Sequence, residues 1–385
     1  MAFDFPNAPT VGQVYQGYTW DGEKWLQTLT TPLSGAVRYD AAQGLTVNQM
    51  AQARSNIGDL KKNYVLNGAM MVSQENGATA GTTSLYYPVD QFMVQFSNAG
   101  AISVAQEANP TPAGSPNRLV VSVTTADAAV GASDYSLISQ SIEGFRVADL
   151  NFGTAAAKTI IIQFGVVAAA GTYCVSVTNS AANRSYVAEY AISAGEAGNN
   201  VVKSVVIPGD ITGTWPKDNT AGLIVRWGLM AGSNFQAAAG SWSAGNFIGT
   251  ANQTNVMAAA STFFRLGDVG LYEGNVAPPF MVPDYASELA LCKRYWQRLG
   301  GTVASDIYIR GYVNGVAALA STLVYPVEMR APPAAAMAGT WAQSGNGSPS
   351  FALGTRSTCI TMTTTAAGDT FLYNNGGSLT LNARI

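Results

Sequence analysis

Between residues 159 and 271 the chain repeatedly alternates apolar and polar residues with a period of two. Six short runs show this pattern, each rich in β-branched and aromatic residues and bounded by clusters of Gly, Asn, Ser and Pro. They are residues 159–167, 172–177, 184–192, 201–207, 223–229 and 263–271. Successive side chains of a strand point to opposite faces, so this period predicts strands that bury one face on a core. We therefore expect a mainly β chain with a large sandwich.

The sandwich is expected to occupy residues 64–282. In its fifth run Leu223, Val225 and Trp227 share the apolar face, while Arg226 points the other way. About 220 residues are enough for a double-sheet jelly roll with long loops. Prolines then interrupt the chain up to Pro283, and residues 288–298 read as a short helix, so we expect a connector helix within residues 283–299.

Residues 300–385 predict a smaller C-terminal β domain. Asn314-Gly315 is the dipeptide typical of a two-residue type I′ hairpin. The run STCITMTTT, residues 357–365, suits strands whose exposed face is threonine. A unit of about 85 residues with so few charges would gain stability if three copies packed around an axis.

Residues 1–35 predict a short N-terminal hairpin. Asp21-Gly22 is a strong turn signal between Trp20 and Trp25, so two aromatic strand ends should meet across the turn. Tryptophans in a piece too small for its own core usually bury against something else. Two interpretations stay open: Trp20 and Trp25 dock on another protein, or the hairpin folds onto the chain's own next segment.

Residues 36–63 contain a short helix with clear ends. Thr46 and Gln49 form a capping box, and Gly58 can take the left-handed conformation that stops a helix. About ten residues is too short for a helix that is stable alone in water. An apolar stripe runs along it, formed by Val47, Met50, Ala53 and Ile57. The stripe suits copies of the helix in a small bundle, and the alternative is a helix lying on its own domain.

Composition excludes several classes of function. The chain has no histidine, which removes serine–histidine and cysteine–histidine catalysis and the commonest ligand of transition metals. The net charge is −3 and no basic run exceeds Lys61-Lys62, so we expect no nucleic-acid partner. Cys174, Cys292 and Cys359 lie far apart without metal-ligand spacing and are expected to be small buried residues in a reduced compartment.

The sequence also predicts no membrane insertion. It has no apolar stretch of about 18 residues, and its first residues lack the basic-then-apolar order of a signal peptide. We therefore expect synthesis in a cytoplasm.

Chemistry-bearing groups are sparse. A glycoside hydrolase needs two carboxylates about 5 Å or about 6.5–9.5 Å apart in a groove. Three pairs lie close in the sandwich sequence, and we interpret them as solvated turn carboxylates: Glu143 with Asp149, Asp210 with Asp218, and Asp268 with Glu273. Asp149 with Asn151 is too small a set for calcium. We predict no catalytic residue, no metal site and no cofactor.

Aromatic residues in polar loops are the better binding candidates. A sugar site combines a ring for the apolar sugar face with amides and carboxylates for its hydroxyls. The candidates are Trp215 with Asp218 and Asn219, Trp242, Trp341, and Tyr373 with Asn374. For each aromatic residue the alternative is a ring folded back over the edge of the core.

Several of these stretches resemble segments of tailed-bacteriophage proteins. LTVNQMAQARSNIG, residues 45–58, resembles a neck helix of tail fibres and receptor-binding proteins, and PNAPTVGQVY with YTWDGEKW is similar to the leading segment of many tail-associated proteins. The stretches NYVLNGAMMVSQENG, SIEGFRVADLNFG and LYEGNVAPPFMVPDY look like a jelly-roll domain of phage tail proteins, distantly similar to carbohydrate-binding modules. YPVEMRAPP resembles a segment that follows this domain, before a distal tip.

The resemblance implies a virion appendage made in the host cytoplasm. Such proteins are usually homotrimers, whose N-terminus would dock on a virion protein and whose outer part would attach noncovalently to a host-surface polysaccharide. Two alternatives remain: a tailspike enzyme that trims glycan, and a purely structural head, collar or neck fibre.

The neck helix yields a first prediction. Replacing Met50 and Ile57 with aspartate should loosen or dissociate the trimer, because the charges would face one another in the bundle. The mass of the assembly, measured by sedimentation, checks this. An unchanged mass would assign trimerisation to the β domains.

Overall fold

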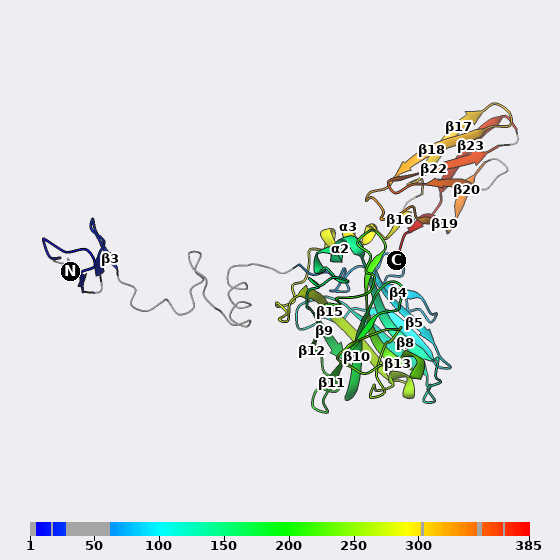
Figure 1. Ribbon diagram of the computed structural model, residues 1–385. Helices are drawn as coiled ribbons and strands as arrows, with labels where there is room; N and C mark the ends of the chain where they lie inside the picture. The colour runs from blue at the N-terminus through cyan, green and yellow to red at the C-terminus, as the bar shows by residue number, and fades with distance from the viewer. Residues whose placement is uncertain (1–4, 17, 28–61, 302–303, 345–348, 365) are drawn as a thin grey trace. The chain divides into compact units, whose positions relative to one another are not determined.

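The computed structural model describes residues 5–16, 18–27, 62–301, 304–344, 349–364 and 366–385. The expected neck helix, with Val47, Met50, Ala53 and Ile57, lies outside the described residues. The chain forms two compact units, Met1–Leu60 and Lys61–Ile385. The described residues are mainly β, as expected (Figure 1).

The N-terminal unit contains the predicted hairpin. Strands β1 (Val14–Tyr15), β2 (Tyr18–Trp20) and β3 (Trp25–Gln27) form an antiparallel sheet. Trp20 faces Trp25 across the turn with ring centroids 5.6 Å apart, and the Asp21 carboxylate accepts hydrogen bonds from the N–H groups of Glu23 and Lys24. Phe5 stacks on Trp25 at 5.1 Å, so these rings form a small cluster of their own.

The sandwich of the second unit has two antiparallel sheets. Their strand orders are β14-β11-β10-β13-β8-β5-β4 and β12-β9-β15-β7-β6. The strands are β4 (Tyr86–Val89), β5 (Phe92–Ser97), β6 (Ala101–Glu107), β7 (Arg118–Thr125), β8 (Tyr135–Glu143), β9 (Ile160–Val167), β10 (Gly171–Thr178), β11 (Ser185–Ile192), β12 (Val201–Ile207), β13 (Ala221–Ala231), β14 (Trp242–Ser243) and β15 (Phe263–Glu273). All six predicted runs are strands, and the ends of each lie within two residues of those predicted.

The strand order confirms the jelly roll. Leaving aside the short β14, eight strands from β7 to β15 divide into the orders β7-β15-β9-β12 and β8-β13-β10-β11. The chain crosses between the sheets at every step except from β10 to β11, and the last strand pairs with the first. Two sheets of four strands connected in this way make a jelly roll. The remaining strands extend its edges (Figure 1).

Trp227 lies at the centre of the sandwich core. It is fully buried on β13, and its ring contacts Phe92 of β5 and Phe164 of β9 at centroid distances of 6.1 and 5.9 Å. The neighbouring Arg226 points to the opposite face, as the alternation predicts, and donates a hydrogen bond to Asn246 at 2.5 Å. Burial lowers the pKa of Arg226 to about 10, because residues after β13 fold over this face of the sheet.

Short helices lie between the strands. They are α2 (Gly144–Val147), η1 (Ala148–Leu150), η2 (Ser233–Phe235), η3 (Val256–Ala258) and α3 (Tyr285–Lys293). The connector α3 begins and ends earlier than the expected 288–298. Asp284 caps its N-terminus by accepting the N–H of Ser287 at 2.9 Å, and Trp296 already belongs to the next strand, paired with Asn382.

The C-terminal residues form three three-stranded sheets, β16-β24-β19, β17-β23-β20 and β18-β22-β21. Their strands are β16 (Trp296–Gly300), β17 (Tyr308–Val313), β18 (Ala318–Val324), β19 (Ala334–Ala338), β20 (Trp341–Gln343), β21 (Ser350–Leu353), β22 (Ser357–Thr363), β23 (Gly368–Asn374) and β24 (Ser378–Asn382). Along β22 Thr358, Ile360 and Met362 are buried, while Thr361 and Thr363 point outward, so threonine forms part of the outer face as expected. Cys359 shares this face and is partly exposed, so the expectation that it is buried is wrong.

The expected hairpin at Asn314-Gly315 is wrong. Strand β17 pairs with β23 and β18 pairs with β22, so the loop between β17 and β18 connects two different sheets. A type I′ turn needs positive φ at both central residues, and only Gly315 has it, at 89°. The dipeptide does lie in a loop, but β17 and β18 each pair with a strand far away in the sequence and not with each other.

A buried carboxylate joins the end of β8 to the segment that follows α3. Glu143 is 2% exposed and accepts two hydrogen bonds from the Arg294 guanidinium, at 2.9 and 2.6 Å, and one from the Tyr295 hydroxyl at 2.7 Å. The hydrogen bonds to Glu143 raise the pKa of Arg294 against the effect of its partial burial. Arg330 and Asn219 add a reciprocal pair of hydrogen bonds between the C-terminal sheets and the sandwich.

This junction gives a stability prediction. Arg294→Gln should lower the free energy of unfolding by about 2–3 kcal/mol, because it leaves a buried carboxylate without its cation, and the loss is moderated because Arg294 is 33% exposed. Urea unfolding measures the difference. As a control, Arg356→Gln breaks a pair with Glu328 that is largely exposed and should change stability by no more than about 0.5 kcal/mol. An equal loss in the free energy of unfolding for the two variants would contradict a stabilising role of the Glu143–Arg294 pair.

Candidate glycan-binding sites

Trp215 lies in the loop between β12 and β13, where its ring is largely buried. Its exposed fraction is 7%, its indole N–H donates to the carbonyl of Thr212 at 3.1 Å, and its ring meets Phe152 edge-on at 5.0 Å. Asp218 accepts both the N–H and the hydroxyl of Thr220, which closes a turn and lowers the pKa of the carboxyl. Of the predicted trio, only Asp218 is exposed, because Asn219 donates its side-chain amide to the carbonyl of Arg330 at 2.8 Å.

The structure brings Trp215 and Trp242 together. Trp242 stands on the edge strand β14, opposite Tyr186 of β11, and its indole N–H donates to the carbonyl of Pro208 at 2.8 Å. Its ring lies 5.5 Å from Trp215, 5.9 Å from Phe152 and 5.4 Å from Tyr186. Phe152 and Tyr186 were not predicted, because nothing local in the sequence places them beside the two tryptophans.

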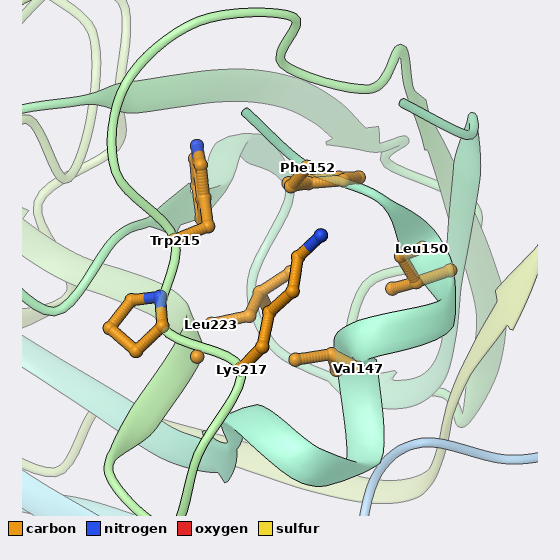
Figure 2. Close-up of a pocket in the computed structure, with 8 residues that line it drawn as sticks. Val147, Leu150, Phe152, Trp215, Lys217 and Leu223 are labelled. Carbon is orange, nitrogen blue, oxygen red and sulfur yellow. The ribbon is translucent and has the colours of Figure 1, made fainter. Parts of the chain in front are cut away.

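The pocket at this aromatic cluster is small. Figure 2 shows the Lys217 side chain extending between Trp215 and Leu150, above Leu223 and Val147. The free volume is about 10 Å³, which is about enough for one water molecule. The pocket is therefore too small for a sugar ring.

An ion pair holds the same loop. Asp210 is 1% exposed and accepts two hydrogen bonds of 2.8 Å from Arg184, whose guanidinium lies 6.0 Å from the Trp242 ring. Burial opposes ionisation of Asp210, but the hydrogen bonds from Arg184 and Thr212 outweigh it and lower the pKa. Asp210 is thus committed to holding the loop.

The other carboxylates of the three pairs are also bound within the chain. Asp149 accepts the hydroxyl of Tyr64 at 2.7 Å, Asp268 accepts the hydroxyls of Thr111 and Ser115, and Glu273 pairs with Lys158 at 2.9 Å. Asn151, considered with Asp149 for calcium, donates its amide to the backbone of Asp149. Across the described ranges, no three Asp, Glu or Cys groups gather as a metal set.

Among the helices that the structure describes, none has the length and apolar character to cross a membrane.

A roomier hollow lies at the opposite end of β13 from the Trp215 loop. Its volume is about 310 Å³, which is near the lower limit for ligand pockets. Hydroxyls, amides and small apolar groups line it, from Val130, Met230, Ser233, Gln236, Gln253 and Asn255. No aromatic ring is among its lining residues, and sequence reasoning gave no signal for it.

The predicted C-terminal residues differ in accessibility. Asn374 is fully buried, where it accepts the N–H of Ile307 and donates to the carbonyl of Gly377, so it contributes no surface group. Trp341 packs against the C-terminal core and donates its indole N–H to Ala338. Tyr373 instead lies on the outer face of its sheet, 6.0 Å from Tyr308.

Tyr373 is partly exposed and belongs to a row of outward rings that sequence reasoning missed. Tyr308 is 51% exposed and Tyr312 is 74% exposed. Their signal was present as a period of two, in Tyr308-Ile309-Arg310-Gly311-Tyr312 and Phe371-Leu372-Tyr373.

No protein-family model matches the chain, and neither does any curated protein sequence. Among solved structures, the enzymatically active domain of tailspike protein 4 of bacteriophage CBA120 is similar at 10% identity and a TM-score of 0.30, over 55% of this chain and 21% of that one. The α-L-arabinofuranosidase MgGH51 is similar at 13% identity and a TM-score of 0.29, over 60% and 31%. A family 11 carbohydrate-binding module of Clostridium thermocellum is similar at 14% identity and a TM-score of 0.26, over 51% and 96%.

This chain thus spans less than a third of the length of the first two structures. Likeness at these TM-scores carries no functional weight, and the jelly roll is assigned from the strand order of the two sheets.

The burial of Trp215 leads to a prediction. Trp215→Ala should lower the free energy of unfolding by about 3 kcal/mol, because it empties a packed site, whereas Trp242→Ala at the partly exposed edge should cost less. Urea unfolding of both variants measures this. If Trp215→Ala left stability unchanged and reduced glycan binding, Trp215 would be a ligand contact instead of part of the core edge.

Proposed function

We propose that this chain is a structural fibre protein or adhesin of a tailed-phage virion, and that as a homotrimer it attaches noncovalently to a host-surface polysaccharide. The observation that carries the proposal is the tyrosine row on the outer face of the C-terminal sheet β17-β23-β20, where Tyr308 is exposed, Tyr373 is partly exposed and their ring centroids lie 6.0 Å apart. Tyrosine offers an apolar ring to a sugar face and a hydroxyl to its polar edge.

Noncovalent attachment agrees with the contacts that the carboxylates make within the chain. The carboxylates that could have formed a hydrolytic pair are bound by arginine, lysine or hydroxyl groups of the chain. Charged residues are only 11% of the sequence, so adhesion through rings and hydroxyls would be tolerant of salt. Three weak sites in a trimer raise avidity by a factor of roughly 10² to 10⁴.

The remaining parts take roles in assembly under this proposal. The N-terminal unit docks on a virion protein, through the hairpin of Trp20 and Trp25 and the exposed aliphatic residues beside it, Val11, Val14 and Leu26. The segment around Met50 and Ile57 forms the trimer neck.

In the sandwich, Trp242 with Asp218 provides a second glycan contact. Trp215 supports the Trp242 ring from the core edge, and Asn219 holds this loop to Arg330. Near the tyrosine row, Trp341 supports the edge of the sheet.

The proposal is tested by competition. The purified chain, added to host cells before virions, should reduce virion adsorption in a concentration-dependent way, because it occupies the same receptors. Adsorption is counted as free virions remaining after mixing. A chain that never competes with virions identifies a purely structural head, collar or neck fibre, and reducing ends released from host polysaccharide identify a glycan-trimming enzyme.

A further inference from the structure

The outer face of sheet β17-β23-β20 carries two rows of side chains in register. Tyr308 lies opposite Tyr373, Arg310 opposite Phe371, and Tyr312 opposite Asp369. The intervening residues point inward, since Ile309, Val313 and Leu372 are buried in the C-terminal core. The alternation therefore turns every ring of these two rows to the same side.

The rings sit close enough to form one surface. Phe371 and Tyr373 have centroids 5.8 Å apart and planes inclined by 30°, and Tyr308 continues the surface from the neighbouring strand. On the third strand the residue beside Tyr373 is Ala342, whose small side chain adds no ring or charge to the surface, and Phe371 and Tyr373 stay partly exposed. Four residue steps from Tyr308 to Tyr312, at about 3.3 Å each, make a face roughly 13 Å long, the span of about two to three sugar rings.

An ion pair stands in the middle of this face. Arg310 donates three hydrogen bonds to the Asp369 carboxylate, the shortest at 2.6 Å, and the two side chains are 57% and 47% exposed. The pair therefore cancels its own charge while presenting N–H donors and carboxylate acceptors to solvent. A vicinal diol can bridge such a pair without displacing either member.

The neighbouring sheet β18-β22-β21 provides an internal comparison. Apart from Val324 at the end of β18, the outward residues of its central part are small: Ala320, Thr322, Ala352, Cys359 and Thr361. A flat face of methyl and hydroxyl groups suits packing against another protein surface. Rings that bracket a neutralised ion pair suit a ligand with apolar ring faces and hydroxyl edges, which describes a sugar.

We propose that the face formed by Tyr308, Arg310, Tyr312, Asp369, Phe371 and Tyr373 binds a neutral oligosaccharide segment of two to three rings. The sugar rings lie along the strands on Tyr308, Phe371 and Tyr373, and adjacent hydroxyls bond to Arg310 and Asp369. This assignment rests on the proposed attachment to host glycan and names the kind of glycan and the residues that select it.

The test uses the full chain on an array of neutral and acidic oligosaccharides from one to four rings, followed by titration calorimetry with the tightest ligand. Wild type should bind neutral di- to tetrasaccharides, and affinity should rise at least about tenfold from one ring to three. Tyr308→Ala with Tyr373→Ala should weaken binding at least about tenfold, as expected for contacts at the centre of a site. Arg310→Gln should change which sugars bind, because it removes the guanidinium, whose N–H groups can donate to two adjacent sugar hydroxyls.

Tyr285→Ala is the matched control. Tyr285 is 54% exposed on α3, close to the 51% of Tyr308, and it lies off this face, so its loss should leave affinity unchanged. Thermal unfolding of every variant shows that the fold persists.

The outcomes separate this inference from the proposed function. Undiminished binding by the double variant, or binding confined to acidic sugars, overturns the assignment of this face and leaves glycan attachment standing. Wild type that binds no oligosaccharide, yet competes with virions on cells, also overturns the assignment. A double variant that changes the mass of the assembly would show that the face packs against a second copy instead.

Discussion

The burial of alternate side chains between two sheets is the constraint on which the rest of this structure depends. Trp227 occupies the centre of that layer and contacts Phe92 and Phe164 from strands far away in the sequence. Once these inward rows are buried, register is fixed, since a slip of one residue would expose the whole apolar set. Fixed register then places each loop at a defined end of the sandwich, and with it the segments that hold the C-terminal sheets.

The same constraint explains how the charged residues are used. A sandwich with few charges has loops and a connector that still need directional contacts, and buried carboxylates supply them. Glu143 anchors Arg294 and Tyr295, and Asp210 anchors Arg184 beside the tryptophan cluster. These two carboxylates hold segments in place. The rings that stand in rows on the C-terminal sheet are the basis on which we propose adhesion.

Sequence patterns predicted the strands of the sandwich and the pairing of Trp20 with Trp25, but not the partners of β17 and β18. The six runs of the sandwich were predicted correctly because the alternation of apolar and polar residues is a local pattern, and each run is long enough to bury one face on the core. Asn314-Gly315 failed as a hairpin because the choice of partner depends on residues more than forty positions away, in β22 and β23. For Trp215 the sequence left two interpretations open, a sugar-facing ring and a ring folded over the core edge, and the structure favours the second, since Trp215 is mostly buried against Phe152.

The sequence alone determined that this protein is mainly β, that it lacks histidine chemistry, and that a turn brings Trp20 to Trp25. These follow from composition and from neighbours along the chain. Only the tertiary structure decided which aromatic residues reach solvent. Tyr308 and Tyr373 became one surface because antiparallel pairing of β17 and β23 set them opposite each other, while the same alternation buried Asn374 one position further on. Whether a side chain is exposed depends on which other elements pack against its strand. The sequence of the strand gives its alternation but not those elements.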